Sequence, residues 1–415
     1  MQNLKKPKKY LRICLLSYRS NPHCGGQGVY IKNISRALKD IGHNVEVVSG
    51  PPYPELDSDI LLHSLENLDL YNPDDLFRTP RIDELKKFPN LIEWLDVCTM
   101  GYPEPLTFGM RAINFIKRNK KQYDIVHDNQ CLSYGIQKIS RHIPLVATIH
   151  HPMTVDRNLA VRSAPNFFRK LQQLRWYSFV GMQKRVAKNI SKIITVSNCS
   201  ANDISKAYNI NINRFRIVPN GIDITKFYPI SRIKRIPYRI ITTNSADTPL
   251  KGLIYLLQAV SSIRKKRKIE LYVVGSPKKN GIVEKMVSKL NLKNNVIFLG
   301  RISNSEFVTQ YAKAGIAVIP SLYEGFGLPA GEAMACAIPV ISTTGGALPE
   351  VVGDAGILVP PKNAYALEKA ILHIFDNPQK AEILGKKGLQ RVHKFFTWEN
   401  AAKKTVDIYR EVLLG

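Results

Sequence analysis

A chain of 415 residues with 44% hydrophobic and 22% charged residues has the composition of an ordinary globular protein. This length exceeds what one hydrophobic core usually supports, so we expect two domains, one of them carrying an insertion. No apolar run reaches the ~18 residues that a membrane-spanning helix needs. The six cysteines are scattered without CxxC spacing, which argues against a disulfide framework or a zinc site and favours a cytoplasmic protein.

The net charge of +27 favours contact with an anionic partner. Residues 167–192 mix aromatic and basic side chains at helical spacing. This pattern is typical of a helix at a membrane interface, but also of a basic helix that covers a sheet, and both interpretations stay open. Because no recognition motif accompanies the charge, we expect a peripheral association with an anionic membrane surface and no nucleic-acid partner.

Apolar, β-branched runs alternate with helical patterns along the whole chain, which predicts an α/β fold. In the first half the predicted strands are Leu11–Ser17, Val45–Ser49, Asp124–His127, Pro144–His150, Lys192–Ser197 and Phe215–Pro219. In the second half they are Tyr238–Thr243, Glu270–Gly275, Asn295–Gly300, Ile316–Pro320, Pro339–Ser342 and Gly356–Val359. Two comparable sets predict two Rossmann-like, doubly wound domains that face a cleft.

The polar, Pro-containing stretch 228–237 marks the predicted join between the domains. We therefore predict a first domain over residues 1–228 and a second over 229–396. Residues 51–105 are rich in Pro and Asp and have weaker strand signals, which indicates an insertion in the first domain.

The first strand leads into a glycine loop that contains Gly25 and Gly26. The loop does not complete the GxGxxG pattern that starts at Gly26, because Ile31 stands where the third glycine is required. A dinucleotide-binding interpretation is therefore weak. Two later strands end in polar residues, at Asp128 and Asn129 and at His150 and His151. Strand ends of this kind lie where ligands bind in such sheets.

Lys251 lies where a predicted helix begins, after Thr248 and Pro249. A positive charge at the N-terminal end of a helix interacts unfavourably with the helix dipole, at a cost of a few tenths of a kcal/mol, unless an anion is bound there. A diphosphate at this position would make both positive features favourable.

The most informative segment is EGFGLPAGE, in which Glu324 and Glu332 lie eight positions apart. It follows a buried strand and carries glycines that permit close backbone approach, with Pro329 at the predicted first helical position and Glu332 in the first turn. Strand, glycine loop and helix start form a cradle of free amides for phosphate. Two carboxylates beside it suit the hydroxyl groups of a sugar and a ribose.

This segment resembles the E-x7-E signature of the family 4 retaining glycosyltransferases, which have the two-domain GT-B fold. The similarity extends over nearly the whole chain, through the early glycine loop, TIHHP, VPNGID, PLKG, VVG and the C-terminal FTWENAAKKTVDIYREVL. It implies transfer of a sugar from a nucleotide-diphosphate sugar to a hydroxyl acceptor (a glycan, a lipid-linked sugar or a small molecule), without a metal or a cofactor. It also implies that a helix over residues 397–415 returns to the first domain.

The resemblance assigns roles to matching positions. The implied catalytic residues are His150, Lys251 and Glu324. The implied donor-binding residues are Gly25, Gly26, Arg301, Gly325, Phe326, Gly327, Leu328 and Glu332. An acceptor-side cluster is expected at Asp128, Asn129 and His151.

One departure from the family pattern lies at Ser245, where an arginine that contacts the diphosphate is usual. Arg301 is the predicted replacement. Two other functions remain open at this point: a GT-B epimerase or phosphorylase, and a non-catalytic sugar-binding relative.

Overall fold

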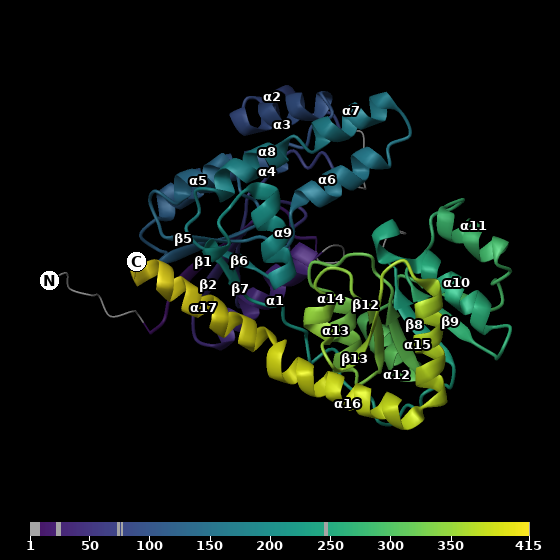
Figure 1. Cartoon of the computed structure of the whole chain (residues 1–415). Helices are drawn as coiled ribbons and strands as arrows, with labels where there is room; N and C mark the ends of the chain where they lie inside the picture. Colours follow the sequence, from purple (N-terminus) through teal and green to yellow (C-terminus); the bar gives the residue numbers. More distant parts are fainter. Residues whose placement is uncertain (1–8, 22–25, 73–74, 76–77, 245–247, 415) are drawn as a thin grey trace. The chain divides into compact units, whose positions relative to one another are not determined.

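The structure, a computed structural model, describes residues 9–21, 26–72, 75, 78–244 and 248–414. The chain divides into two units (Figure 1). Unit 1 runs up to Val196 and takes in Ser200–Val218 and the chain from Trp398 onward, while unit 2 holds Ser197–Cys199 and Pro219–Thr397. The structural division after Val218 precedes the one expected at residue 228.

Unit 1 is built on a seven-stranded sheet in the order β3-β2-β1-β4-β5-β6-β7. Each neighbouring pair of strands is parallel. The strands are β1 (Arg12–Ser17), β2 (Asn44–Ser49), β3 (Leu61–Ser64), β4 (Ile125–Asn129), β5 (Leu145–Thr148), β6 (Ile193–Thr195) and β7 (Phe215–Ile217). β3 lies within the predicted insertion, so part of that region extends the sheet.

Helices pack on both faces of this sheet, although not every helix of unit 1 does so. The helices of unit 1 are α1 (Gly26–Asp40), α2 (Ile82–Leu85), α3 (Phe88–Cys98), α4 (Glu104–Asn119), α5 (Tyr134–Ile139), α6 (Met153–Arg162), α7 (Phe167–Trp176), α8 (Phe179–Ala187), α9 (Asn198–Tyr208), the 3-10 turn η1 (Ile212–Arg214) and α17 (Trp398–Leu414). Alternate residues of β1 serve two cores, because successive strand side chains point to opposite faces. Ile13 and Leu15 pack with α1 and α17, while Cys14 and Leu16 pack with α4, α5 and α8.

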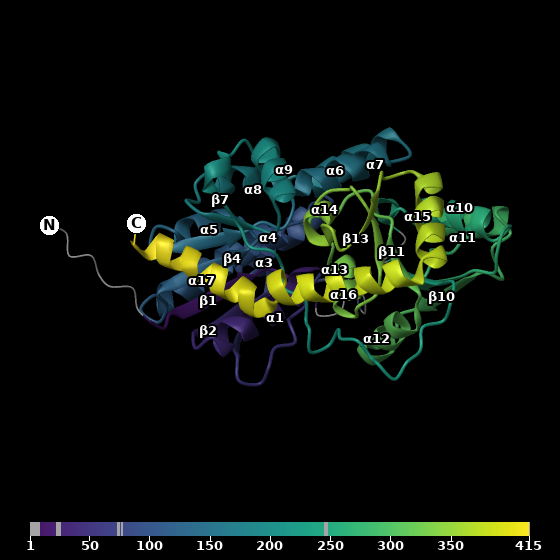
Figure 2. The same ribbon diagram turned by 60° about the horizontal axis from the view of Figure 1, so that its bottom comes forward.

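The last helix, α17, belongs to unit 1, as expected from the family resemblance, and lies beside α1 (Figure 2). A buried polar bridge joins it to the sheet. His127 Nδ1 lies 2.6 Å from the Tyr409 hydroxyl, and His127 Nε2 lies 2.7 Å from Thr148 Oγ1. Burial lowers the pKa of His127 to about 3, so the ring is neutral, and one ring nitrogen donates to a hydroxyl oxygen while the other accepts from the second hydroxyl.

Unit 2 is built on a six-stranded parallel sheet in the order β10-β9-β8-β11-β12-β13. Its strands are β8 (Arg239–Thr243), β9 (Glu270–Val274), β10 (Val296–Gly300), β11 (Ile316–Ile319), β12 (Val340–Thr343) and β13 (Gly356–Val359). Its helices are η3 (Pro249–Lys251), α10 (Leu253–Ile263), α11 (Ile282–Lys289), α12 (Asn304–Lys313), α13 (Leu328–Ala335), α14 (Leu348–Val352), α15 (Ala364–Asp376) and α16 (Pro378–Phe395). The prediction of two doubly wound α/β units is confirmed.

Tyr409→Phe should lower the free energy of unfolding by about 1–3 kcal/mol, because it leaves a buried ring nitrogen of His127 without its partner. Urea unfolding followed by tryptophan fluorescence measures this change. Tyr365→Phe is the matched control, since that side chain is 66% exposed and should change nothing. Equal stability of the two variants would contradict the bridging role.

Candidate active site

The connections of unit 2 reverse direction between two neighbouring strands. From β8 the chain proceeds through β9 to β10 at one edge, whereas from β11 it proceeds through β12 to β13 at the other. Parallel sheets bind ligands at such a switch point, beyond the carboxyl ends of the strands. Lys251 follows β8 and Glu324 follows β11, so the sheet order brings these two distant segments together.

The side chains of Lys251 and Glu324 form an ion pair, with 2.8 Å between Nζ and Oε1. Ser321 Oγ donates to the same carboxylate oxygen at 2.7 Å. The two loops are also joined by their backbones, because the Leu322 amide donates to the Leu250 carbonyl at 2.7 Å. The side chain of Lys251 is 24% exposed and that of Glu324 is 14% exposed. Lys251 thus has a carboxylate to balance its charge and hold its position.

Glycine is required at two approaches in this site. A Cβ on Gly252 would lie 2.0 Å from the Pro320 carbonyl oxygen, and one on Gly346 would lie 2.2 Å from that of Glu324. Both residues also have positive φ values, of 66°. These glycines allow the loops after β8 and β12 to pack directly on the loop after β11. The Ala347 amide then donates to the Glu324 carbonyl at 2.8 Å.

The helix that follows, α13, begins at Leu328 with Gly327 as its N-cap, in a left-handed conformation at φ 101°. Pro329 is therefore the second helical residue rather than the first. Glu332 lies beyond the first turn, so the expectation that it lies in that turn was wrong. The half-buried Glu332 lies instead in a poorly solvated environment, and burial raises the pKa of its carboxyl to about 7, against the smaller opposing effect of Lys226 and Lys251.

The other predicted donor residues divide into three groups. Gly325 and Leu328 are half-buried, and Phe326 is buried with its ring 5.7 Å from that of Phe396. Arg301 is exposed after β10, and β9 separates β10 from β8, so the structure does not join Arg301 to the ion pair. Gly25 and Ser245 lie outside the described residues, whereas Gly26 opens α1 with open space around its Cα.

In unit 1 the corresponding reversal lies between β1 and β4. His150, just after β5, is half-buried and contacts polar and aromatic groups, among them Asn129 at the end of β4. Its Nε2 lies 2.8 Å from Asn129 Oδ1, and its ring stands edge-on to Tyr30, with 4.7 Å between centroids. Burial lowers the pKa of His150 to about 3, so the imidazole is neutral, and its Nε2 proton is held by Asn129.

The structure separates the three predicted acceptor-side residues. Asn129 contacts His150, as described. Asp128 is fully buried, its Oδ2 accepts from the Leu132 amide at 2.9 Å, and burial raises its pKa to about 7. His151 points elsewhere, with Nε2 2.7 Å from Asp156 Oδ2 in α6. Asp128 is therefore placed to hold the turn after β4, and not to face solvent.

Sequence reasoning missed several residues that shape the donor site: Ser321, Gly252, Gly345 and Gly346. The Gly-Gly pair after β12 was the available signal, because adjacent glycines at a strand end mark a turn with special backbone geometry. Ser321 offered none, since a lone serine becomes informative only when its partner is known.

Comparison with known proteins agrees with this architecture. Residues 24–226 match the family model "Glycosyltransferase Family 4", and residues 231–391 match "Glycosyl transferases group 1". The chain is 44% identical over 408 residues to an MMP alpha-(1->4)-mannosyltransferase of Mycolicibacterium hassiacum, covering 97% of this chain and 98% of that protein.

Solved structures with the same fold include sucrose-phosphate synthase from Thermosynechococcus elongatus, with a TM-score of 0.73 at 24% identity, covering 97% of this chain and 99% of that one. The Anabaena protein HepE in complex with UDP-glucose has a TM-score of 0.69 at 16% identity, covering 97% and 100%. The two parallel sheets thus have the GT-B fold of glycosyltransferases. The chain belongs to glycosyltransferase family 4, and it is a glycosyltransferase.

The raised pKa of Glu332 predicts a pH-dependent stability. Between the ordinary value of 4.5 and about 7 the folded chain keeps a proton that the unfolded chain releases, so native stability falls as pH rises through this window. Glu332→Gln removes this loss. Relative to the native chain, the variant should gain up to about 3 kcal/mol between about pH 5 and about pH 8.

Thermal unfolding at several pH values measures the difference. Glu399→Gln is the control, because that carboxylate is 63% exposed and should give a pH-independent offset. A constant difference between Glu332→Gln and the native chain would contradict a carboxyl group that titrates near neutral pH.

Proposed function

We propose that this glycosyltransferase moves a hexosyl group, with retention of configuration, from a nucleotide-diphosphate sugar to a hydroxyl acceptor. The observation that carries the proposal is the Lys251–Glu324 pair beside the start of α13, at the switch point of the unit 2 sheet. The named complex of HepE with UDP-glucose supports a nucleotide-sugar donor. The similarity to a mannosyltransferase supports mannose as the transferred sugar.

The ammonium group of Lys251 and the positive end of the α13 dipole would supply the positive charge for the leaving diphosphate. Charge that develops on a leaving group is stabilised best by donors that are already in place. The ion pair with Glu324 fixes the lysine before the donor binds, and the lysine retains further N–H groups for phosphate oxygens. Glu324 would orient sugar hydroxyls, and Glu332 would accept from the ribose. We propose that this charge serves in place of a metal, with no cofactor beyond the donor.

The surroundings of the carboxylate at the unit 1 switch point favour a same-face route to retention over a covalent intermediate. Asp128 is fully buried and is engaged by the backbone of Leu132, which leaves it poorly placed as a covalent nucleophile. A same-face mechanism, in which the leaving phosphate assists the incoming hydroxyl, requires no such nucleophile. The neutral ring of His150 would contact the sugar without adding charge.

The two other functions left open by the sequence are less well supported. Similarity to a mannosyltransferase over 97% of the chain favours a transferase over an epimerase or a phosphorylase. An intact Lys251–Glu324 pair with its Ser321 contact is the geometry of an equipped donor site, which disfavours a non-catalytic relative. The product would belong to a cell-surface glycan, a glycolipid or a small-molecule glycoside.

A peripheral membrane contact is supported by α7. Within the described ranges, no helix is long and apolar enough to cross a membrane. No residue of α7 is buried, so this helix does not cover the sheet. Its exposed apolar side chains are interspersed with Arg169 and Lys170, the composition of an interfacial helix on anionic lipid. They are Phe167, Phe168, Leu171 and Leu174.

A cytoplasmic location is supported by the thiols. Within the described residues, Cys14, Cys98, Cys131 and Cys336 are free thiols. Free thiols suit a reducing compartment. On this proposal the enzyme would meet the inner, anionic leaflet of a membrane.

Lys251→Met and Glu324→Gln should each lower kcat/KM for transfer by about 10²-fold or more, because the first removes the cation and the second removes the carboxylate that positions it. Release of nucleoside diphosphate from UDP-, GDP- and ADP-sugars, with product analysis of the linkage, measures activity and stereochemistry. Lys386→Met breaks an exposed 2.6 Å pair with Glu382 and is the matched control. Full activity in Lys251→Met would refute the proposed site, and a product of inverted configuration would refute retention.

The double variant Phe167→Ser/Phe168→Ser should lose sedimentation with vesicles that contain phosphatidylserine, since the two rings are 69% and 82% exposed. Binding of the native chain should weaken in high salt, because part of it is electrostatic. Tyr365→Ser/Ile383→Ser, at exposed positions of α15 and α16, is the control. If the α7 variant and the control bind vesicles equally, α7 is not the contact.

A further inference from the structure

Unit 1 contains a cavity to which none of the roles above has been assigned. Its volume is about 350 Å³, within the size range of small-ligand pockets. Its lining side chains are Tyr18, Arg19, Tyr71, Tyr102, Met153, Trp176, Tyr177 and Phe179. Tyr18 and Arg19 directly follow β1, and Met153 opens α6 shortly after β5. The cavity therefore lies at the carboxyl edge of the sheet, beside the switch point between β1 and β4.

The aromatic walls are held by one another and by the region predicted as an insertion. Tyr102 stacks on Trp176, with 5.0 Å between ring centroids and 29° between planes. Tyr71 stands edge-on to Trp176, at 5.4 Å and 77°, and its hydroxyl donates to the Gly101 carbonyl at 3.0 Å. Two walls of the cavity thus come from residues 51–105, and their rings are oriented before any ligand arrives.

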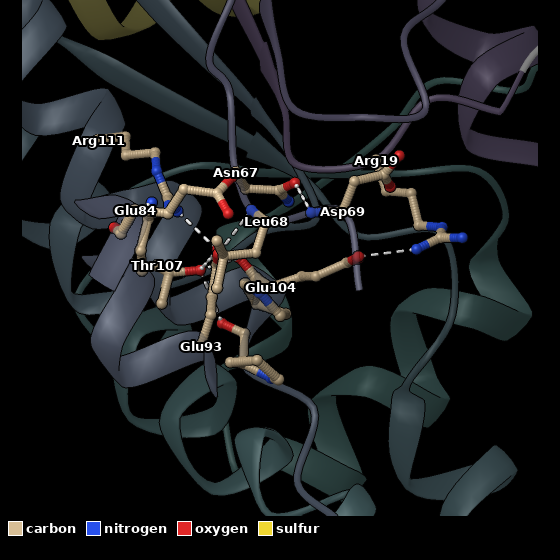
Figure 3. A network of polar contacts seen from close by, with 12 residues as sticks. Arg19, Asn67, Leu68, Asp69, Glu84, Glu93, Glu104, Thr107 and Arg111 are labelled. Carbon is tan, nitrogen blue, oxygen red and sulfur yellow. Dashed lines mark hydrogen bonds and ion pairs between the residues drawn. The ribbon is translucent and has the colours of Figure 1, made fainter. Parts of the chain in front are cut away.

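A polar network fixes the segment that carries Tyr71 (Figure 3). The buried carboxylate of Glu93 accepts from the Leu68 amide at 3.1 Å and from Thr107 Oγ1 at 2.6 Å. Arg111 completes the network with a 2.7 Å ion pair to Glu93. These contacts hold Leu68, three residues before Tyr71, and so fix the part of the chain that carries the Tyr71 wall of the cavity.

The cavity carries little net charge. Of the described residues that line it, Arg19 is the one with a charged side chain. Its guanidinium pairs with Glu104 Oε1 at 2.8 Å (Figure 3). Glu104 Oε2 accepts from the Tyr102 hydroxyl at 2.6 Å. Because Glu104 balances the charge of Arg19, the cavity presents less positive charge to a phosphate group than an unpaired arginine would. The tyrosine hydroxyls and the remaining guanidinium N–H groups suit neutral hydroxyls instead.

We propose that this cavity is the acceptor subsite, and that it takes a neutral sugar ring stacked on the Tyr102 and Trp176 rings. The inference rests on the proposed function, since it deepens the identity of the hydroxyl acceptor. The C–H-rich face of a pyranose packs on an aromatic ring while its edge hydroxyls bond to polar groups around it. The aromatic walls and the Arg19–Glu104 pair therefore favour a neutral sugar ring over a phosphorylated one.

Binding can be measured without the donor. The intrinsic fluorescence of Trp176 should change when α-1,4-linked mannobiose is added to the full chain, and calorimetry should give a dissociation constant. The dissociation constant of mannose 6-phosphate should be at least about tenfold higher than that of mannobiose. Mannobiose that fails to bind, or mannose 6-phosphate that binds more tightly, overturns the inference.

Variants then locate the subsite. Trp176→Ala should raise KM for mannobiose about tenfold or more while KM for the donor stays within about twofold. Trp176→Phe retains a stacking face and a similar packing volume, so it should restore most of the affinity, and it separates lost stacking from a fold defect. Tyr134→Ala, at an exposed ring on α5, is the matched control.

The two proposals fail in different ways. If Trp176→Ala transfers sugar to mannobiose with the native KM, the acceptor subsite lies elsewhere, although the glycosyltransfer proposal stands. If no nucleotide sugar is turned over by the native chain but mannobiose binding depends on Trp176, the function is wrong and the sugar-binding cavity remains. Equal effects of Trp176→Ala on donor and acceptor KM would also count against the subsite.

Discussion

The order of strands in two parallel sheets is the constraint on which both candidate half-sites depend. In each sheet the connections leave in opposite directions from two central neighbours, β1 and β4 in unit 1, and β8 and β11 in unit 2. Loops that diverge at such a point leave room beyond the strand ends, and residues far apart in the chain meet there. Lys251 and Glu324 lie 73 positions apart, yet they form one ion pair.

Close backbone approach is the second requirement of the donor site. The loops after β8, β11 and β12 can touch only because Gly252 and Gly346 lack a Cβ where a carbonyl oxygen would meet it. Burial then acts on the carboxyl group of Glu332 and raises its pKa to about 7, where its charge responds to small environmental changes. The same packing that positions the acidic groups therefore also tunes them.

In unit 1 burial shifts the pKa of basic groups in the opposite direction, downward, and again favours the neutral form. His127 and His150 are kept neutral, and each is fixed by hydrogen bonds to neighbouring side chains. On the proposed function, the sheet edge with neutral imidazoles and aromatic walls would receive uncharged hydroxyls, and Lys251 in unit 2 would receive the diphosphate. The two units thus offer different chemistry, which is what a donor and an acceptor require.

The sequence by itself determined the twelve strands that it predicted, because long β-branched runs bounded by glycine, proline or asparagine have little alternative to a buried parallel strand. It also marked Glu324, Lys251 and His150, since each ends a strand or begins a helix. It missed β3, a half-exposed four-residue strand in which hydrophobic periodicity is weak. It misplaced Glu332, whose helix begins one residue earlier than Pro329 indicated. Only the tertiary structure decided that Lys251 pairs with Glu324, that Asp128 is buried, and that aromatic rings from the predicted insertion close around Arg19. These facts depend on which segments meet across a sheet, and local pattern contains no information about such meetings.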